Sequence, residues 1–343
     1  MTKRLVIFNH KGGVSKTTSA YNIGWMISKA HRVLLVDADS QCNLTGLFLG
    51  DDFEQYYTNE HTKNQNIKDG VAATFGGKPN PIEAVDCYSP TRANNLFLLA
   101  GHANLSEYDA ALQFAQTSNN AITTLQNLPG AFAELLRLTE DKYQIDYTII
   151  DLNPSLSAIN QNLFLISDAF IIPTNPDPFS LMALETLRTT LPRWVSWKRS
   201  AVELFESSTY PIPRGTPKFV GSLIQRFNIR NGRAARPYRN NIDEINAKIG
   251  NGFIEALSAF NMTLSQSEYG PDLIGESYCL GQIPDFQGLL PKSYNAGVPV
   301  FELKNSEIHE SGTVLEGLKK RRDEFHHQFS EIATNVVRLA SFT

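Results

Sequence analysis

The chain has 343 residues, of which 42% are hydrophobic and 19% are charged, so it can bury a sizeable core and is not expected to be disordered. Its formal net charge is -4, and it shows neither a run of eighteen apolar residues nor a signal-peptide pattern, which argues against a membrane or secreted protein. The three cysteines, Cys42, Cys87 and Cys279, lie far apart, which argues against a disulfide framework or a zinc site. We therefore expect a soluble, cytoplasmic protein.

Short apolar runs alternate with helical patterns along most of the chain. Residues 15–30 and 314–342 carry apolar residues at helical spacing. Strands are predicted over residues 4–8, 32–39, 146–155, 168–176 and 218–227. Apolar strands that alternate with helices imply a parallel sheet buried on both faces. We expect an α/β fold: a doubly wound, mostly parallel sheet flanked by helices, forming a single domain over residues 1–343.

Two stretches fit this alternation poorly. Residues 51–95 are polar and rich in turn-forming residues, and residues 190–217 contain several prolines. Because proline removes a backbone donor, we expect no long regular element over 190–217. Both stretches are interpreted as surface insertions, and the C-terminal helix over 314–342 is expected to pack back on the body.

The stretch "NHKGGVSKTT" (9–18) follows the first predicted strand and opens the first predicted helix. Such a position, with backbone N–H groups, a lysine and a hydroxyl, is typical of a phosphate-binding loop. The general pattern G-x-x-x-x-G-K-[ST] fails twice, because His10 and Ser15 stand at its glycine positions. The candidate nucleotide-binding residues in the loop are Gly12, Gly13, Val14, Ser15, Lys16, Thr17 and Thr18.

The form K-G-G-V-x-K-T-T resembles the deviant Walker A motif of the ParA/MinD family of P-loop ATPases. The resemblance identifies Lys11 as that family's signature lysine, which reaches across a dimer interface to the partner's nucleotide. It also implies catalytic roles for Lys11 and Lys16 and a homodimer that forms with ATP.

Two later segments carry carboxylates at strand ends. "LLVDADSQCNLT" (34–45) resembles the family's D-x-D-P-Q-x-N segment, which implies that Asp37 is catalytic, near the attacking water, and that Asp39 begins the first switch. "YTIIDLNPS" (147–155) resembles the Walker B strand, with Asp151 holding Mg²⁺ through water. Ser40 and Asn153 replace prolines of the two family patterns. Thr17, Asp39 and Asp151 are therefore the expected magnesium residues.

The segment "GQIPDFQGLLPKSYNAGVPVFEL" (281–303) resembles the part of the family sequence that lies along the adenine. The resemblance implies backbone contacts near Ile283 and Pro284 and a side-chain contact from Gln225. No N-K-x-D guanine-reading motif is visible, so ATP is favoured over GTP.

Ser15 stands directly before the loop lysine, where glycine is favoured because the backbone lies close to phosphate. Serine is a mild replacement, which a small loop shift could accommodate. We hypothesise that nucleotide binding survives and that hydrolysis is slow.

Charge is unevenly distributed along the chain. Residues 188–240 hold eleven Lys/Arg against two Glu, a pattern associated with polyanion contact. The i, i+3 spacing from Arg230 onward could align several arginines along one helical or turn face, although a solvated surface would give the same pattern. The candidate DNA-binding residues are Arg226, Arg230, Arg233, Arg236 and Arg239.

The resemblance implies a ParA-type partition ATPase that binds nonspecific DNA as an ATP dimer and is activated by a ParB-like partner, and so is associated with the nucleoid. Because the first strand begins by residue 5, we expect no N-terminal helix-turn-helix domain, and the C-terminal segment lacks the pattern of a membrane-binding helix. Two alternatives stay open: an ATP-dependent dimerisation switch in a larger regulatory complex, and an ATP-dependent ligase on the same fold.

Overall fold

The computed structural model describes residues 2–117, 125–230 and 233–343. Its centre is a seven-stranded sheet in the order β3-β2-β4-β1-β5-β6-β9, in which every neighbouring pair is parallel. The strands are β1 (Lys3–Ile7), β2 (Val33–Ala38), β3 (Leu96–Leu99), β4 (Tyr147–Leu152), β5 (Ala169–Thr174), β6 (Lys218–Gln225) and β9 (Cys279–Ile283). The expected doubly wound parallel sheet is confirmed.

All five predicted strands are present in this sheet, and its other two strands, β3 and β9, were not foreseen. β3 is only four residues long and follows a turn-rich stretch, while β9 contains Gly281, which weakens a strand pattern. A Cβ at Gly281 would lie 2.8 Å from Ile332 Cδ1 of the C-terminal helix, so a larger residue would force that side chain to shift.

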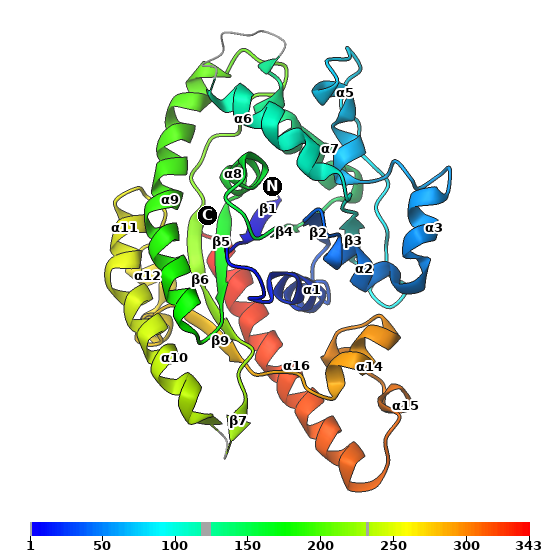
Figure 1. The fold of residues 1–343 in the computed structure, drawn as a ribbon, viewed down its shortest axis with the longest axis vertical. Coiled ribbons are helices and arrows are strands. Elements are labelled where there is room, and N and C mark those ends of the chain that lie inside the picture. The colour runs from blue at the N-terminus through cyan, green and yellow to red at the C-terminus, as the bar shows by residue number, and fades with distance from the viewer. Residues whose placement is uncertain (1, 118–124, 231–232) are drawn as a thin grey trace.

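Helices cover both faces of the sheet (Figure 1). α1 and α16 pack together on one face, and α7, α8 and α9 cover the other. The longer helices are α1 (Lys16–Ile27), α6 (Asp109–Thr117), α7 (Leu128–Tyr143), α8 (Ala158–Leu165), α9 (Pro178–Leu204), α10 (Arg236–Lys248), α14 (Leu289–Ala296) and α16 (Gly312–Ala340). The shorter ones are α2 (Asn43–Leu49), α3 (Phe53–Thr58), α4 (Ile67–Gly70), α5 (Ala72–Phe75), α11 (Ile254–Ser258), α12 (Gln266–Tyr269), α13 (Pro271–Gly275) and α15 (Asn305–Ile308).

The expectation that prolines exclude a long element over 190–217 is wrong. α9 runs for 27 residues with Pro192 in its interior, and only 205–217 is irregular. An interior proline costs a helix about 3 kcal/mol. Here Leu191, Trp194 and Val195 are buried in the core beside it, so packing of the helix face outweighs the lost hydrogen bond.

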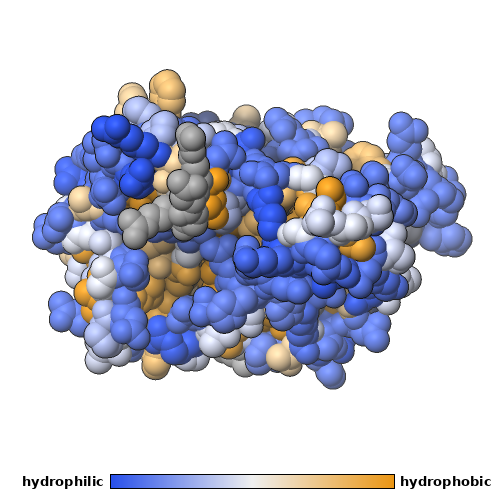
Figure 2. Space-filling view, turned by 90° about the horizontal axis from the view of Figure 1, so that it is seen from below, coloured by the Kyte–Doolittle hydropathy of each residue, from blue (hydrophilic) through white to orange (hydrophobic). Residues whose placement is uncertain are grey.

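The 51–95 stretch lies between β2 and β3 and contains the short helices α3, α4 and α5. α16 covers the C-terminal stretch for which a helix was predicted, and it buries Phe325, Phe329 and Val336. Within the described ranges, no helix is long and apolar enough to span a bilayer. Seen from the lower end of Figure 1, the surface is mostly hydrophilic, and hydrophobic residues gather in one hollow (Figure 2).

Candidate active site

A cavity of about 660 Å³ lies at the carboxyl ends of the central strands, where ligands bind in open α/β sheets. Its walls come from the loop after β1, the start of α1, the segment after β2, and the segments that follow β6 and β9. Ten of the residues expected to bind nucleotide or magnesium line it: Gly13, Val14, Ser15, Lys16, Thr17, Thr18, Asp39, Gln225, Ile283 and Pro284. Gly12, Lys11, Asp37 and Asp151 do not.

The loop backbone has the shape that a phosphate cradle requires. Gly13 has φ 72°, and Ser15 has φ 60° and ψ 36°, so both lie in the left-handed region directly before α1. Glycine is therefore favoured at position 15 because of its backbone conformation, and serine occupies it at a cost of about 1–2 kcal/mol.

Lys16 lies at the buried floor of this loop. Its Nζ donates to the Lys11 carbonyl oxygen at 3.3 Å, and the side chain is largely buried. Burial lowers the pKa of Lys16, and the nearby charges of Asp151 and Asp39 partly offset that effect. A negatively charged phosphate bound nearby would favour the charged form of Lys16.

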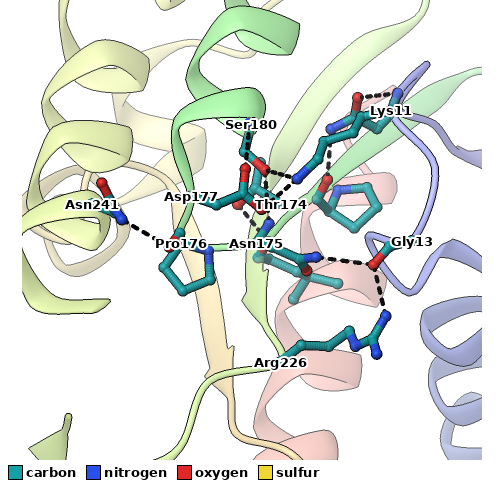
Figure 3. A network of polar contacts seen from close by, with 12 residues as sticks. Lys11, Gly13, Thr174, Asn175, Pro176, Asp177, Ser180, Arg226 and Asn241 are labelled. Carbon is teal, nitrogen blue, oxygen red and sulfur yellow. Dashed lines mark hydrogen bonds and ion pairs between the residues drawn. The ribbon is translucent and has the colours of Figure 1, made fainter. Parts of the chain in front are cut away.

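Lys11 is held by its own chain. Its Nζ forms an ion pair with Asp177 and donates to Ser180 Oγ at 3.1 Å, at the start of α9 (Figure 3). Asp177 is also the N-cap of α9, where it accepts the Ser180 N–H at 2.9 Å. In this conformation Lys11 neither lines the cavity nor points freely away from the molecule, and Asp177 is a site residue that sequence reasoning missed.

The three strand-end carboxylates separate into two groups. Asp37 and Asp151 are register neighbours on β2 and β4, and both are fully buried. Asp37 Oδ2 accepts from Thr45 N at 2.8 Å and from Thr45 Oγ1 at 2.7 Å. Burial raises the pKa of Asp37 to about 6. Asp37 therefore contacts the segment after β2 through Thr45, whereas Asp39 lines the cavity wall. The catalytic role expected for Asp37 stays a prediction.

The residues expected to hold magnesium fit such an ion. Neither carboxylate oxygen of Asp151 has a hydrogen-bond partner of good geometry within the described chain. Burial, followed by the charge of Asp37, raises the pKa of Asp151 to about 8 despite the neighbouring Thr17 hydroxyl and Lys16. In the same ranges, no group of three His, Cys, Asp or Glu side chains could hold a metal alone. This suits Mg²⁺, which uses one or two carboxylates together with water and substrate phosphates.

The cavity lining also includes residues from β6 and from the segment after β9. Gln225 is buried and its Nε2 donates to Ser19 Oγ at 2.5 Å, which fixes the amide against α1. Ile283 and Pro284 line the cavity as well. Sequence reasoning missed three aromatic residues of the lining: Phe53 of α3, Phe286 before α14, and Tyr294 of α14.

The basic segment is divided between a hairpin and a helix. β7 (Ile229–Arg230) and β8 (Arg233–Ala234) form a hairpin in which Arg230 and Arg233 are paired, and α10 begins at Arg236. Residues 231–232 and the side chains of Arg230 and Arg233 lie outside the described part of the chain. Arg236 and Arg239 share the exposed first turn of α10.

Arg226 lies apart from those arginines, although it was expected to bind DNA with them. Its φ is 60°, it lines the cavity, and its Nη1 donates to the Gly13 carbonyl at 3.1 Å. Asn175 Nδ2 donates to the same carbonyl at 2.9 Å (Figure 3). Two side chains from the ends of β5 and β6 therefore hold the loop.

Known proteins resemble this chain in sequence and in fold. The chromosome partitioning protein ParA of Caulobacter vibrioides is 30% identical over 191 residues, which is 55% of this chain and 62% of that protein. The chain thus matches less than two thirds of this relative's length. A protein from Corynebacterium diphtheriae shares the fold with a TM-score of 0.65 at 22% identity, covering 86% of this chain and 97% of that one. The structure of pNOB8 ParA bound to nonspecific DNA has a TM-score of 0.55 with this chain at 19% identity, and the match covers 99% of both chains.

A family model described as an AAA domain, AAA_31, matches residues 2–203. This range holds the phosphate loop, the carboxylates after β2 and β4, and the Lys11 partner Asp177. Because the match covers more than half of the sequence, the chain belongs to the AAA_31 family, and it is a P-loop ATPase of the ParA/MinD type.

Proposed function

We propose that this chain binds ATP with Mg²⁺, dimerises in that state, hydrolyses ATP slowly, and binds DNA without sequence preference during plasmid or chromosome partition. The observation that carries the proposal is the phosphate cradle itself. Its left-handed residues Gly13 and Ser15 precede α1, and the buried Lys16 lies at its floor beside two carboxylates.

The chain's own residues divide the chemistry between binding and positioning. Loop N–H groups and Lys16 hold the phosphates, and Thr17 with Asp151 would hold the metal. A bound Mg²⁺ supplies charge neutralisation at the phosphate oxygens. Asp39, on the cavity wall, orients the attacking water, while Asp37 keeps the segment after β2 in place through Thr45. Asp39→Ala is expected to lower the ATPase rate by roughly 100-fold or more while ATP still binds.

Dimerisation requires a rearrangement at Lys11. To reach a partner's phosphates, Lys11 must leave Asp177, and the gain must exceed the loss of this half-buried ion pair. A nucleotide bound in each subunit supplies that gain, because the negative charges of two facing phosphate groups attract the Lys11 ammonium groups. The dimer would then depend on ATP, as the family resemblance implies.

The start of α10 is the strongest candidate for DNA contact. Positive charges in a first helical turn are unfavourable next to the helix dipole, and this turn holds Arg236 and Arg239 without an acidic residue. The same arrangement favours an anion such as a backbone phosphate. Neither arginine forms an ion pair within the described ranges. pNOB8 ParA, which shares the fold, has been solved on nonspecific DNA, which supports the proposal.

A chain of contacts joins this helix to the nucleotide loop. Asn241 of α10 donates to the Pro176 carbonyl at 3.0 Å, and the neighbouring residues Asn175 and Asp177 hold Gly13 and Lys11 (Figure 3). Movement of Lys11 would therefore shift the contacts of α10, so that the nucleotide state could change the affinity for DNA. A ParB-like partner would act on the same ATP-bound dimer.

Sedimentation with and without ATP, followed by DNA titration at several salt concentrations, tests the proposal. We expect a dimer only with ATP, and salt-sensitive binding to random duplex DNA. Arg236→Glu with Arg239→Glu should abolish DNA binding, whereas Lys78→Glu with Lys320→Glu, which changes the charge equally at exposed sites, should weaken it only slightly.

The other outcomes separate the alternatives. An ATP dimer that ignores DNA would indicate a dimerisation switch, and a nucleotide-bound monomer would indicate a ligase. Lys16→Ala should lose ATP binding, with Lys78→Ala as the control; retained binding in Lys16→Ala would overturn the assignment of the site.

A further inference from the structure

The aromatic residues that line the cavity come from two separate parts of the chain. Tyr294 belongs to α14, in the segment after β9, and Phe53 begins α3, in the 51–95 stretch after β2. Figure 1 shows α14 and α2 near one end of α1, and Phe53 follows α2 closely in the chain. The two rings and the phosphate loop line the same 660 Å³ cavity.

The fold leaves about half of Tyr294 exposed. Its side chain is 54% exposed, and its hydroxyl forms no hydrogen bond to another described residue. By contrast, its helix neighbour Ser293 is buried and donates to the Val298 carbonyl at 2.5 Å, so the helix itself is held firmly. A half-exposed aromatic ring that lines a cavity and is carried by a fixed helix is suited to a ligand.

Phe53 is positioned by its neighbours. Its ring lies 5.1 Å from that of Tyr57 in a tilted arrangement, and the Tyr57 hydroxyl donates to the Gly101 carbonyl at 2.6 Å. The Gly101 N–H donates in turn to Thr45 Oγ1, the hydroxyl that also binds Asp37. The start of the 51–95 stretch is therefore anchored to the segment that carries the cavity's carboxylates.

We propose that Tyr294 and Phe53 hold the purine base of the nucleotide by stacking on it, so that the 51–95 stretch and α14 together set base affinity. The proposal rests on ATP binding as proposed above. The phosphate loop fixes one end of the ligand with charge, and a flat aromatic base is the part of a nucleotide that aromatic side chains recognise. Polar groups near the base end are already engaged: Asp285 Oδ1 accepts the Gln287 N–H at 2.7 Å, and Gln225 binds Ser19.

The test compares two ligands that share the phosphate end, ATP and inorganic tripolyphosphate, on the full chain. Tyr294→Ala and Phe53→Ala should each weaken ATP binding by roughly 5- to 150-fold, as expected for loss of one stacked ring, and leave tripolyphosphate affinity unchanged. Tyr294→Phe should bind ATP like the wild type, because stacking does not need the hydroxyl. Phe114→Ala is the matched control, since that ring is also 54% exposed but does not line the cavity.

Wild-type ATP affinity in both Tyr294→Ala and Phe53→Ala would overturn the inference, as would an equal loss of ATP and tripolyphosphate. Melting temperatures of the nucleotide-free variants identify a loss that is due to unfolding, and in that case Tyr294→Leu, which keeps bulk without a ring, replaces the alanine variant. If the wild type binds neither ligand, the proposed function fails; if it binds both and Lys16→Ala binds neither, only the base contacts are under test.

Discussion

Replacing Ser15 by glycine should stabilise the protein, although the change removes a side chain. Ser15 has φ 60° and no side-chain cap hydrogen bond, so its Cβ contributes strain without a compensating contact at the helix start. The left-handed conformation costs about 1–2 kcal/mol for a residue other than glycine. Glycine also raises the entropy of the unfolded chain, which costs about 0.4–1 kcal/mol of stability. The net gain in the free energy of unfolding is therefore about 0.5–1 kcal/mol.

Differential scanning calorimetry of the nucleotide-free protein measures this gain. The unfolding entropy scales with length, at about 2.1 cal/mol/K per residue, so a gain of about 1 kcal/mol raises the Tm of this chain by only about 1–2 °C. Ser15→Ala should not raise the Tm, because alanine keeps the Cβ. Ser311→Gly is the control: Ser311 also precedes a helix, but its φ of -139° gives glycine no conformational advantage.

A Tm for Ser15→Gly that does not exceed those of Ser15→Ala and Ser311→Gly would refute the explanation by backbone strain. The same variants test the hypothesis of slow hydrolysis. If serine slows turnover through the loop backbone, Ser15→Gly should raise the ATPase rate while Ser15→Ala leaves it low.

Three further variants test other parts of the structure. Asp177→Asn keeps the α9 cap but removes the ion pair with Lys11, so a dimer should form at lower ATP concentration in sedimentation; an unchanged or higher requirement would show that the pair does not restrain Lys11. Burial lowers the pKa of Lys198 to about 8 in the folded chain, against 10.5 unfolded, so the unfolded state binds more protons between these values and stability rises with pH there, by about 3 kcal/mol. In urea unfolding, the free energy of unfolding should rise less with pH for Lys198→Met than for the wild type. Equal slopes of this free energy against pH would contradict the burial argument. Gly130→Ala places a Cβ 1.8 Å from a backbone oxygen and should destabilise by more than about 3 kcal/mol, whereas Gly317→Ala, with open space in α16, should stabilise slightly in the same assay.

Much of the sheet could be predicted from local sequence. β1, β2, β4 and β5 are largely apolar or end in a recognisable motif, as burial on both faces of a parallel sheet demands, and β6 is eight residues long. β3 and β9 were not predicted; they have only four and five residues. The course of α9 through Pro192 was missed for another reason: the packing that outweighs a proline comes from residues distant in the chain.

The sequence by itself determined the phosphate loop, the strand-end carboxylates and the two lysines, because these features depend on contiguous residues whose spacing is fixed by a strand, a turn and a helix start. Only the tertiary structure decided what each side chain faces. It pairs Lys11 with Asp177, turns Asp37 inward and leaves Asp39 on the cavity wall, and brings Phe53 and Tyr294 to one cavity. Such contacts join residues that are far apart in sequence, and they depend on how the sheet order and helix packing position the chain, which local spacing does not encode.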